Sequence, residues 1–190
     1  MPPASPKQFT RQTIQRRVAL RGGIMALLLL VAGLLSAGNA LVQAQTPPPL
    51  SAPRQTITLD AAQTMILAAE AKAREIGVPM VIAIVDESGV LKAYSRMDGS
   101  ILTSVDIAQE KAITAVSFGI PTDVLAGAVK SDPTILASVA NIPHAMLISG
   151  GLPIMSGTTL IGGIGVSGSL DPAQDKQVAE AALAVYAAGQ

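Results

Sequence analysis

The sequence predicts an α+β domain in which about five antiparallel strands form a sheet flanked by helices. Two observations lead to this prediction. Short apolar runs, too short for amphipathic helices, are separated by tight turns rich in Gly and Asp, so neighbouring strands should pair as hairpins. Segments with apolar residues at helical spacing lie before, between and after these runs. The expected order is helix, two strands, helices, three strands, helix.

The first helix is predicted at 59–76, with Thr58 as its N-cap and Gly77 just past its end. A hairpin should follow, with a buried strand at 78–85 and a second strand at 90–96, because so short a loop forces antiparallel pairing.

A second helix, capped by Thr103 or Ser104, is expected to run to about Ser117, since Gly119-Ile120-Pro121 breaks it. The last helix has a strong start signal, since Asp171 can cap it and Pro172 suits its first position. The remaining predicted elements are helical pieces at 122–130 and 132–140, strands at 145–148, 152–155 and 160–166, and the last helix to about residue 187.

The first 44 residues have the order of a secretory signal peptide. Five basic residues and no acidic ones precede an apolar run at 24–35, and small residues then lead to a cleavage site after Ala44, with cleavage after Ala40 as the alternative. The run is shorter than the roughly 20 residues of a membrane span, so we expect no stable membrane anchor after cleavage, with an uncleaved anchor as the alternative. We expect a periplasmic or secreted protein. Arg16 and Arg17 fit the twin-arginine pattern loosely, so both that route and the general secretory (Sec) route stay open.

Charge and cysteine content narrow the class of protein. The whole chain has 13 basic and 13 acidic residues; with five basic residues in the leader, the rest carries 8 against 13, a net charge of −5. This balance argues against nucleic acid as a partner. The absence of cysteine excludes disulfides and thiolate metal sites. The proline-rich stretch at 45–56 is typical of an extended linker.

A set of short motifs occurs in one order along the rest of the chain. They are Val85-Asp86 with Gly89, Arg96-Met97-Asp98-Gly99, Ala108 with Lys111-Ala112, Gly150-Gly151 with Pro153-Ile154, and Ile164-Gly165-Val166-Ser167-Gly168 followed by Asp175. Together they resemble the GlcG/HbpS-like family, which includes the C-terminal domain of PduO-type proteins, over residues 58–186. The resemblance implies a profilin-like domain at 57–190, self-assembly into dimers to octamers, and haem binding in several members.

His144 is the only histidine in the chain. Neutral imidazole is the usual axial ligand of haem iron, so His144 is the only candidate if haem is bound through histidine. The alternative is a structural histidine with no ligand. The resemblance also points to a hydroxyl residue before the second helix, which corresponds here to Thr103 or Ser104.

Arg96, Asp98 and Lys111 form a charged set at the loop after the second strand and in the second helix, and they are candidate catalytic residues. Arg96 or Lys111 can bind a carboxylate or a haem propionate, with the amides of Gly150 and Gly151 as further donors. The alternative is a structural salt bridge from Asp98 to Arg96 or Lys111.

Three functions are therefore compatible with the sequence. The first is an exported haem-binding protein, either a scavenger or a redox-sensing accessory. The second is an enzyme or binding protein for a small organic acid or aldehyde, with an Arg/Asp/Lys pocket. The third is a non-catalytic structural oligomer.

Overall fold

The computed structural model describes residues 48–187, and the compact unit that contains the sheet begins at Pro53. The signal peptide predicted at 1–44 lies outside the described residues. Residues 48–58 contain neither helix nor strand. Within the described part of the chain, no single helix has the length and apolar composition of a membrane span; one bent pair of helices, at 104–118 and 122–131, passes that test together.

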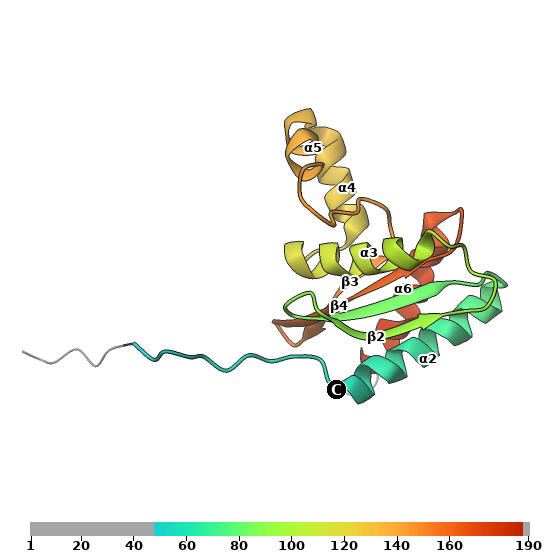
Figure 1. The fold of residues 1–190 in the computed structure, drawn as a ribbon, viewed down its shortest axis with the longest axis horizontal. Coiled ribbons are helices and arrows are strands. Elements are labelled where there is room, and N and C mark those ends of the chain that lie inside the picture. The colour runs from blue at the N-terminus through green and yellow to red at the C-terminus, as the bar shows by residue number, and fades with distance from the viewer. Residues whose placement is uncertain (1–47, 188–190) are drawn as a thin grey trace, which may run out of the picture. The chain divides into compact units, whose positions relative to one another are not determined.

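One antiparallel sheet forms the centre of the unit (Figure 1). Its strands are β1 (Val81–Asp86), β2 (Leu91–Arg96), β3 (Gly151–Ser156) and β4 (Thr159–Ser167), in the order β2-β1-β4-β3. The hairpin predicted at 78–96 is present as β1 and β2, β3 and β4 form a second hairpin, and β1 pairs with β4 to join the two. The expected α+β class is therefore confirmed.

Helices cover both faces of the sheet. α2 (Leu59–Ile76) and α6 (Pro172–Ala187) pack with Ile82 and Ile84 of β1, while α3 (Ser104–Phe118) packs on Val81 and Ala83 of the same strand. Successive side chains of a strand point to opposite faces. Covering both faces therefore explains why the sequence of β1 is apolar throughout and lacks polar alternation.

A helical extension interrupts the order between α3 and β3. It consists of α4 (Thr122–Ser131) and α5 (Pro133–Val139), which project from the sheet beside the end of α3 (Figure 1). Leu125, Val129 and Val139 form a small apolar cluster within it. The extension thus has a core of its own and joins the rest of the unit at its base.

Local capping signals were predicted correctly at two helices. The hydroxyl of Thr58 accepts a hydrogen bond from the amide of Ala61 (3.3 Å), and Gly77 ends α2 with φ +79°. Asp171 accepts a hydrogen bond from the amide of Ala173 (3.0 Å) at the start of α6. At α3 the expectation is wrong: Thr103 takes the N-cap position, but its side chain makes no capping bond.

The strand predicted at 145–148 is also wrong, and the sheet has four strands rather than five. Threonine hydroxyls hold this segment in place of a neighbouring strand. Thr114 Oγ1 accepts from the amide of Met146 (2.8 Å), and Thr122 Oγ1 donates to the carbonyl of Ile148 (2.8 Å). Backbone groups satisfied in this way do not need a β-ladder.

Glycines in β4 allow α3 to lie directly on the sheet. A Cβ atom added at Gly163 would lie 2.6 Å from the carbonyl oxygen of Ala112, and one at Gly165 would overlap the carbonyl oxygen of Ala108. Real side chains do not approach backbone atoms so closely. The glycines of β4 therefore set the distance between the sheet and α3.

Replacing Gly165 with alanine should push α3 away from the sheet. We expect Gly165→Ala to lower the free energy of unfolding by about 3 kcal/mol, because overpacking a dense contact forces backbone shifts. Gly127 is the matched control: it lies exposed inside α4 with no atom within 4 Å of an added Cβ. Gly127→Ala should stabilise the protein by roughly 0.5–1 kcal/mol through helix propensity. Urea denaturation measures both, and equal effects of the two variants would contradict the packing account.

Candidate functional site

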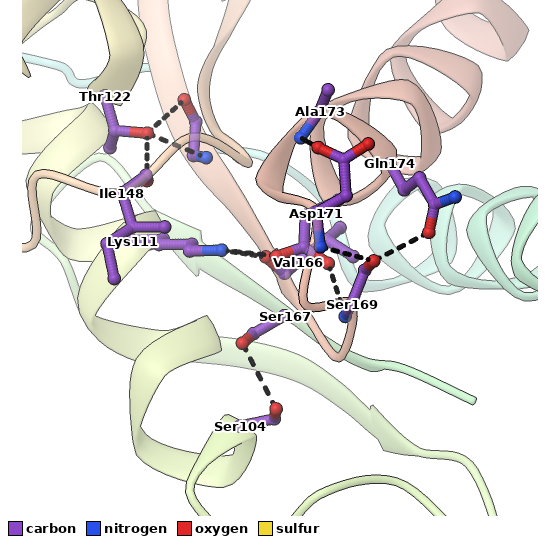
Figure 2. A network of polar contacts seen from close by, with 12 residues as sticks. Ser104, Lys111, Thr122, Ile148, Val166, Ser167, Ser169, Asp171, Ala173 and Gln174 are labelled. Atoms are coloured by element: carbon purple, nitrogen blue, oxygen red, sulfur yellow. Dashed lines mark hydrogen bonds and ion pairs between the residues drawn. The ribbon is translucent and has the colours of Figure 1, made fainter. Parts of the chain in front are cut away.

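Lys111 lies at the centre of a buried polar network (Figure 2). Its Nζ donates to the carbonyl of Val166 (2.8 Å) and to Oδ2 of Asp175 (2.8 Å). The other carboxylate oxygen of Asp175 accepts from the amide of Ser169 (3.0 Å). The ion pair therefore ties the middle of α3 to the end of β4 and to the first turn of α6.

Burial dominates the electrostatics of this pair, since the Lys111 and Asp175 side chains are 1% and 2% exposed. Removal from water lowers the pKa of Lys111 and raises the pKa of Asp175, and the attraction between the two charges opposes both shifts. Lys111 has Asp175 as its partner rather than Asp98. The structure does not bring Lys111 into an exposed cluster with Arg96.

Gly150 and Gly151 pack against the same network. Gly150 has φ +115°, and a Cβ atom there would lie 2.7 Å from the Val166 carbonyl and 3.1 Å from Lys111 Nζ. The amide of Gly151 donates to Thr122 Oγ1 (3.1 Å). The Gly150 carbonyl accepts from the amide of Val166 (2.9 Å). These backbone groups join the start of β3 to its neighbours. The amide of Gly151 has a hydrogen-bond partner within the protein and is therefore not available to a ligand.

The hydroxyl and charged candidates near the start of α3 differ in exposure. Ser104 is buried, and its hydroxyl accepts a hydrogen bond from Ser167 (3.2 Å), as Figure 2 shows. Thr103, Arg96 and Asp98 are exposed. Thr103 and Arg96 therefore stay accessible to a ligand, whereas Ser104 does not.

His144 is accessible and lies in the loop between α5 and β3. Its side chain is 62% exposed, and its Nδ1 lies 3.8 Å from Oε1 of Glu110 on α3. The Nε2 atom is the ring nitrogen on the side away from this contact. An imidazole whose Nδ1 faces a carboxylate is the usual arrangement of a histidine that binds a metal through Nε2.

The backbone at His144 is unusual, because its φ is +64°. This left-handed conformation costs a residue other than glycine about 1–2 kcal/mol. Thr114 contacts the main chain on both sides of it: the hydroxyl lies 2.9 Å from the His144 carbonyl and 2.7 Å from the Glu110 carbonyl, which share its one proton, and it accepts from the amide of Met146. A local turn also favours this conformation, because the amide of Ala145 bonds the carbonyl of Ile142 (3.2 Å) and places Pro143 and His144 at the second and third positions, where the third takes a positive φ.

Comparison with known proteins agrees with the motifs. A family model described as haem degrading protein HbpS-like matches residues 57–184. The chain belongs to the HbpS-like family. A curated relative, the uncharacterized 15.0 kDa protein of the dhaT-dhaS intergenic region of Citrobacter freundii, is 40% identical over 129 residues, which is 67% of this chain and 90% of the relative.

Three solved structures are similar to this member of the HbpS-like family. ORFY of Klebsiella pneumoniae is 35% identical with a TM-score of 0.70, over 75% of this chain and 98% of its own. A double mutant of HbpS from Streptomyces reticuli is 33% identical with a TM-score of 0.65, over 76% and 94%. PduOC in complex with haem is 30% identical with a TM-score of 0.62, over 68% and 94%. The resemblance to HbpS and PduO-type proteins is confirmed.

Three residues of these sites were not predicted as such. Asp175 is the partner of Lys111 across 64 positions, and nothing local in the sequence links the two. Glu110 and Thr114 contact His144 from α3. Their spacing of four residues places them on one side of a helix, which is a signal, but it does not indicate the loop that they contact.

Breaking the buried ion pair should be costly. Lys111→Met leaves the Asp175 carboxylate buried without its partner, and we expect a loss of about 3–5 kcal/mol in the free energy of unfolding. Adding Asp175→Asn removes the isolated charge, so the double variant should be more stable than Lys111→Met alone. Chemical denaturation of both variants tests this. A double variant no more stable than the single one would show that the charge pairing is unimportant.

The strain at His144 predicts an inverted order of stability for two substitutions. His144→Gly should be more stable than His144→Ala by about 1 kcal/mol, because glycine adopts a positive φ without the penalty that alanine retains. Asn141 is the control, because it is exposed and its φ is not positive. There the glycine variant should be no more stable than the alanine variant. Thermal denaturation of the four proteins compares them; an alanine at position 144 that is as stable as glycine would refute the strain.

Proposed function

We propose that this protein is an exported haem-binding protein in which His144 supplies the protein ligand of the iron. Its family is described as HbpS-like haem degrading protein, and one structural neighbour is PduOC in complex with haem. The observation that carries the proposal for this chain is the accessible imidazole of His144, held in a strained loop with Nδ1 facing a carboxylate.

The residues around His144 fit a haem group. Haem iron brings four porphyrin nitrogens of its own, so one protein ligand is sufficient, and this chain has one histidine. Ile142 and Ile148 belong to the same loop and are 44% and 40% exposed. Such apolar side chains suit contact with a macrocycle. When bound, haem would supply a redox-active iron, and the role of this loop is to bind and orient it.

The other candidate residues divide into two groups. Lys111, Ser104, Gly150 and Gly151 are buried and bonded within the protein, which leaves them no part in binding haem directly. Arg96 stays a candidate for a propionate, and Thr103 stays the alternative iron ligand through its hydroxyl.

The parts of the proposal that concern export, biological role and assembly rest on the sequence. The predicted signal peptide supports export to the periplasm or beyond, by the Sec or the twin-arginine route. Scavenging of haem and accessory redox sensing are both compatible with an exposed ligand loop. Assembly into a dimer or a larger homo-oligomer, up to an octamer, is part of the same proposal and is supported by the family resemblance.

The proposed pocket for a small organic acid or aldehyde loses support from the position of Lys111, which is buried against Asp175 and does not face solvent. Arg96 and Asp98 alone give one exposed positive and one exposed negative side chain. We therefore retain the haem proposal as the one that the geometry favours.

A haemin titration followed by absorbance tests the function. The wild-type protein should give a saturable shift of the Soret band, and His144→Ala should weaken binding at least about tenfold, as expected for loss of the metal ligand or its immediate support. Thr103→Val is the matched control and should bind as the wild type does. Loss of binding in Thr103→Val alone would transfer the ligand role to Thr103. No saturable shift in the wild type would refute haem binding and favour a structural oligomer or a small-acid ligand.

A further inference from the structure

We infer that Glu110 and Thr114, one turn apart on α3, form a two-point clamp that prepares His144 for metal binding before any ligand arrives. Thr114 fixes the main chain of the loop, and Glu110 selects the imidazole tautomer that leaves Nε2 unprotonated. The purpose of the clamp rests on the proposed function, but the clamp itself can be measured in the protein without haem.

The Thr114 contact is built into the fold. Thr114 is 2% exposed, and its hydroxyl lies 2.9 Å from the His144 carbonyl and accepts from the amide of Met146 at 2.8 Å. The same hydroxyl lies 2.7 Å from the carbonyl of Glu110 within α3. One hydroxyl therefore joins both sides of His144 to a helix whose own position is fixed on the sheet. Together with the turn closed by the amide of Ala145 on the carbonyl of Ile142 (3.2 Å), these bonds hold the loop with His144 in the left-handed conformation.

The Glu110 contact acts on the ring. At 3.8 Å, the separation between Glu110 Oε1 and His144 Nδ1 is longer than a hydrogen bond, so the interaction is electrostatic. The negative carboxylate attracts an N–H at Nδ1 and repels a lone pair there. In a neutral imidazole one nitrogen carries the proton and the other is the acceptor. The group that contacts one of the nitrogens determines which of the two carries the proton. Glu110 therefore favours a proton on Nδ1 and a free lone pair on Nε2.

Both residues are thus positioning residues, which act on the metal only through His144. A group that contacts the ring nitrogen not bound to the metal raises the basicity of the ligating imidazole and fixes the orientation of the ring. Loss of such a group typically lowers metal affinity by about 10- to 100-fold. His144 also occupies the third position of a turn that the amide of Ala145 closes on the carbonyl of Ile142 (3.2 Å), where a positive φ is expected.

Nitrogen NMR of the haem-free protein labelled with ¹⁵N at histidine tests the Glu110 part. The chain has a single histidine, so the two ring signals belong to His144. At about pH 8 the wild type should show the Nδ1–H tautomer as the major neutral form. Glu110→Ala should shift the population towards Nε2–H. Glu75→Ala is the matched control, because Glu75 is an exposed helical glutamate paired with Lys72, and it should leave the spectrum unchanged.

Amide hydrogen exchange tests the Thr114 part. Thr114→Val removes the hydroxyl but keeps the shape of the side chain, and we expect exchange of the Met146 amide to accelerate by about fivefold, as one hydrogen bond of ordinary strength is lost. Thr64→Val is the matched control: its hydroxyl also bonds the carbonyl four residues earlier, that of Asp60, but it lies exposed on α2. That variant should leave the exchange of Met146 unaltered.

The outcomes separate the clamp from the proposed function. If the wild type is mainly Nε2–H, if Glu110→Ala does not move the tautomer population, or if Thr114→Val leaves Met146 protected, the clamp is refuted even when haemin binds. If the tautomer and exchange results are as expected and haemin does not bind, the clamp stands and haem is the wrong ligand. If the clamp and the haem-binding proposal are both correct, Glu110→Ala should also weaken haemin binding by about 10- to 100-fold.

Discussion

The ion pair between Lys111 and Asp175 is the constraint on which the rest of the structure depends. Two charges are removed from water together, which is favourable only when the geometry is good and the remaining hydrogen-bonding groups are satisfied. In this protein the Val166 carbonyl accepts a second proton of the Lys111 ammonium, and the Ser169 amide donates to the second oxygen of Asp175. The pair therefore requires α3, the end of β4 and the start of α6 to meet at one point, and Gly150 is the residue that fits the space left beside it.

α3 consequently packs on the sheet with one side and contacts the loop of His144 with residues outside that side. The side with Ala108, Lys111 and Ala112 is buried on the glycines of β4 and makes the helix a fixed part of the core. Glu110 and Thr114, which also lie on α3, contact the loop that carries His144. Because the buried side cannot shift without breaking the ion pair, the loop is anchored to a rigid support. Ligand sites held on rigid elements keep their geometry better than sites on free loops.

The helices and hairpins could be predicted because their signals are local: Thr58, Gly77 and Asp171 mark helix ends whatever the remainder of the chain does. The strand expected at 145–148 was wrong because a short apolar run does not reveal that distant threonine hydroxyls will satisfy its backbone. The resemblance identified the family correctly. The partners of Lys111 and His144 could not be predicted, since 64 positions separate Lys111 from Asp175 and only the fold brings them together. Exposure, too, depends on tertiary packing, so the sequence could not show that the Lys111 side chain is buried and the His144 side chain is exposed.

The most direct test of the account is the bond between haem iron and the imidazole of His144. Electron–nuclear double resonance of the ferric haem complex, prepared from a chain labelled with ¹⁵N only at histidine and carrying no added histidines, detects that bond through a single label. The account predicts a ¹⁵N hyperfine coupling of the size expected for a directly bound nitrogen. A complex that forms saturably but shows no ¹⁵N coupling would contradict it and would require another residue to hold the iron.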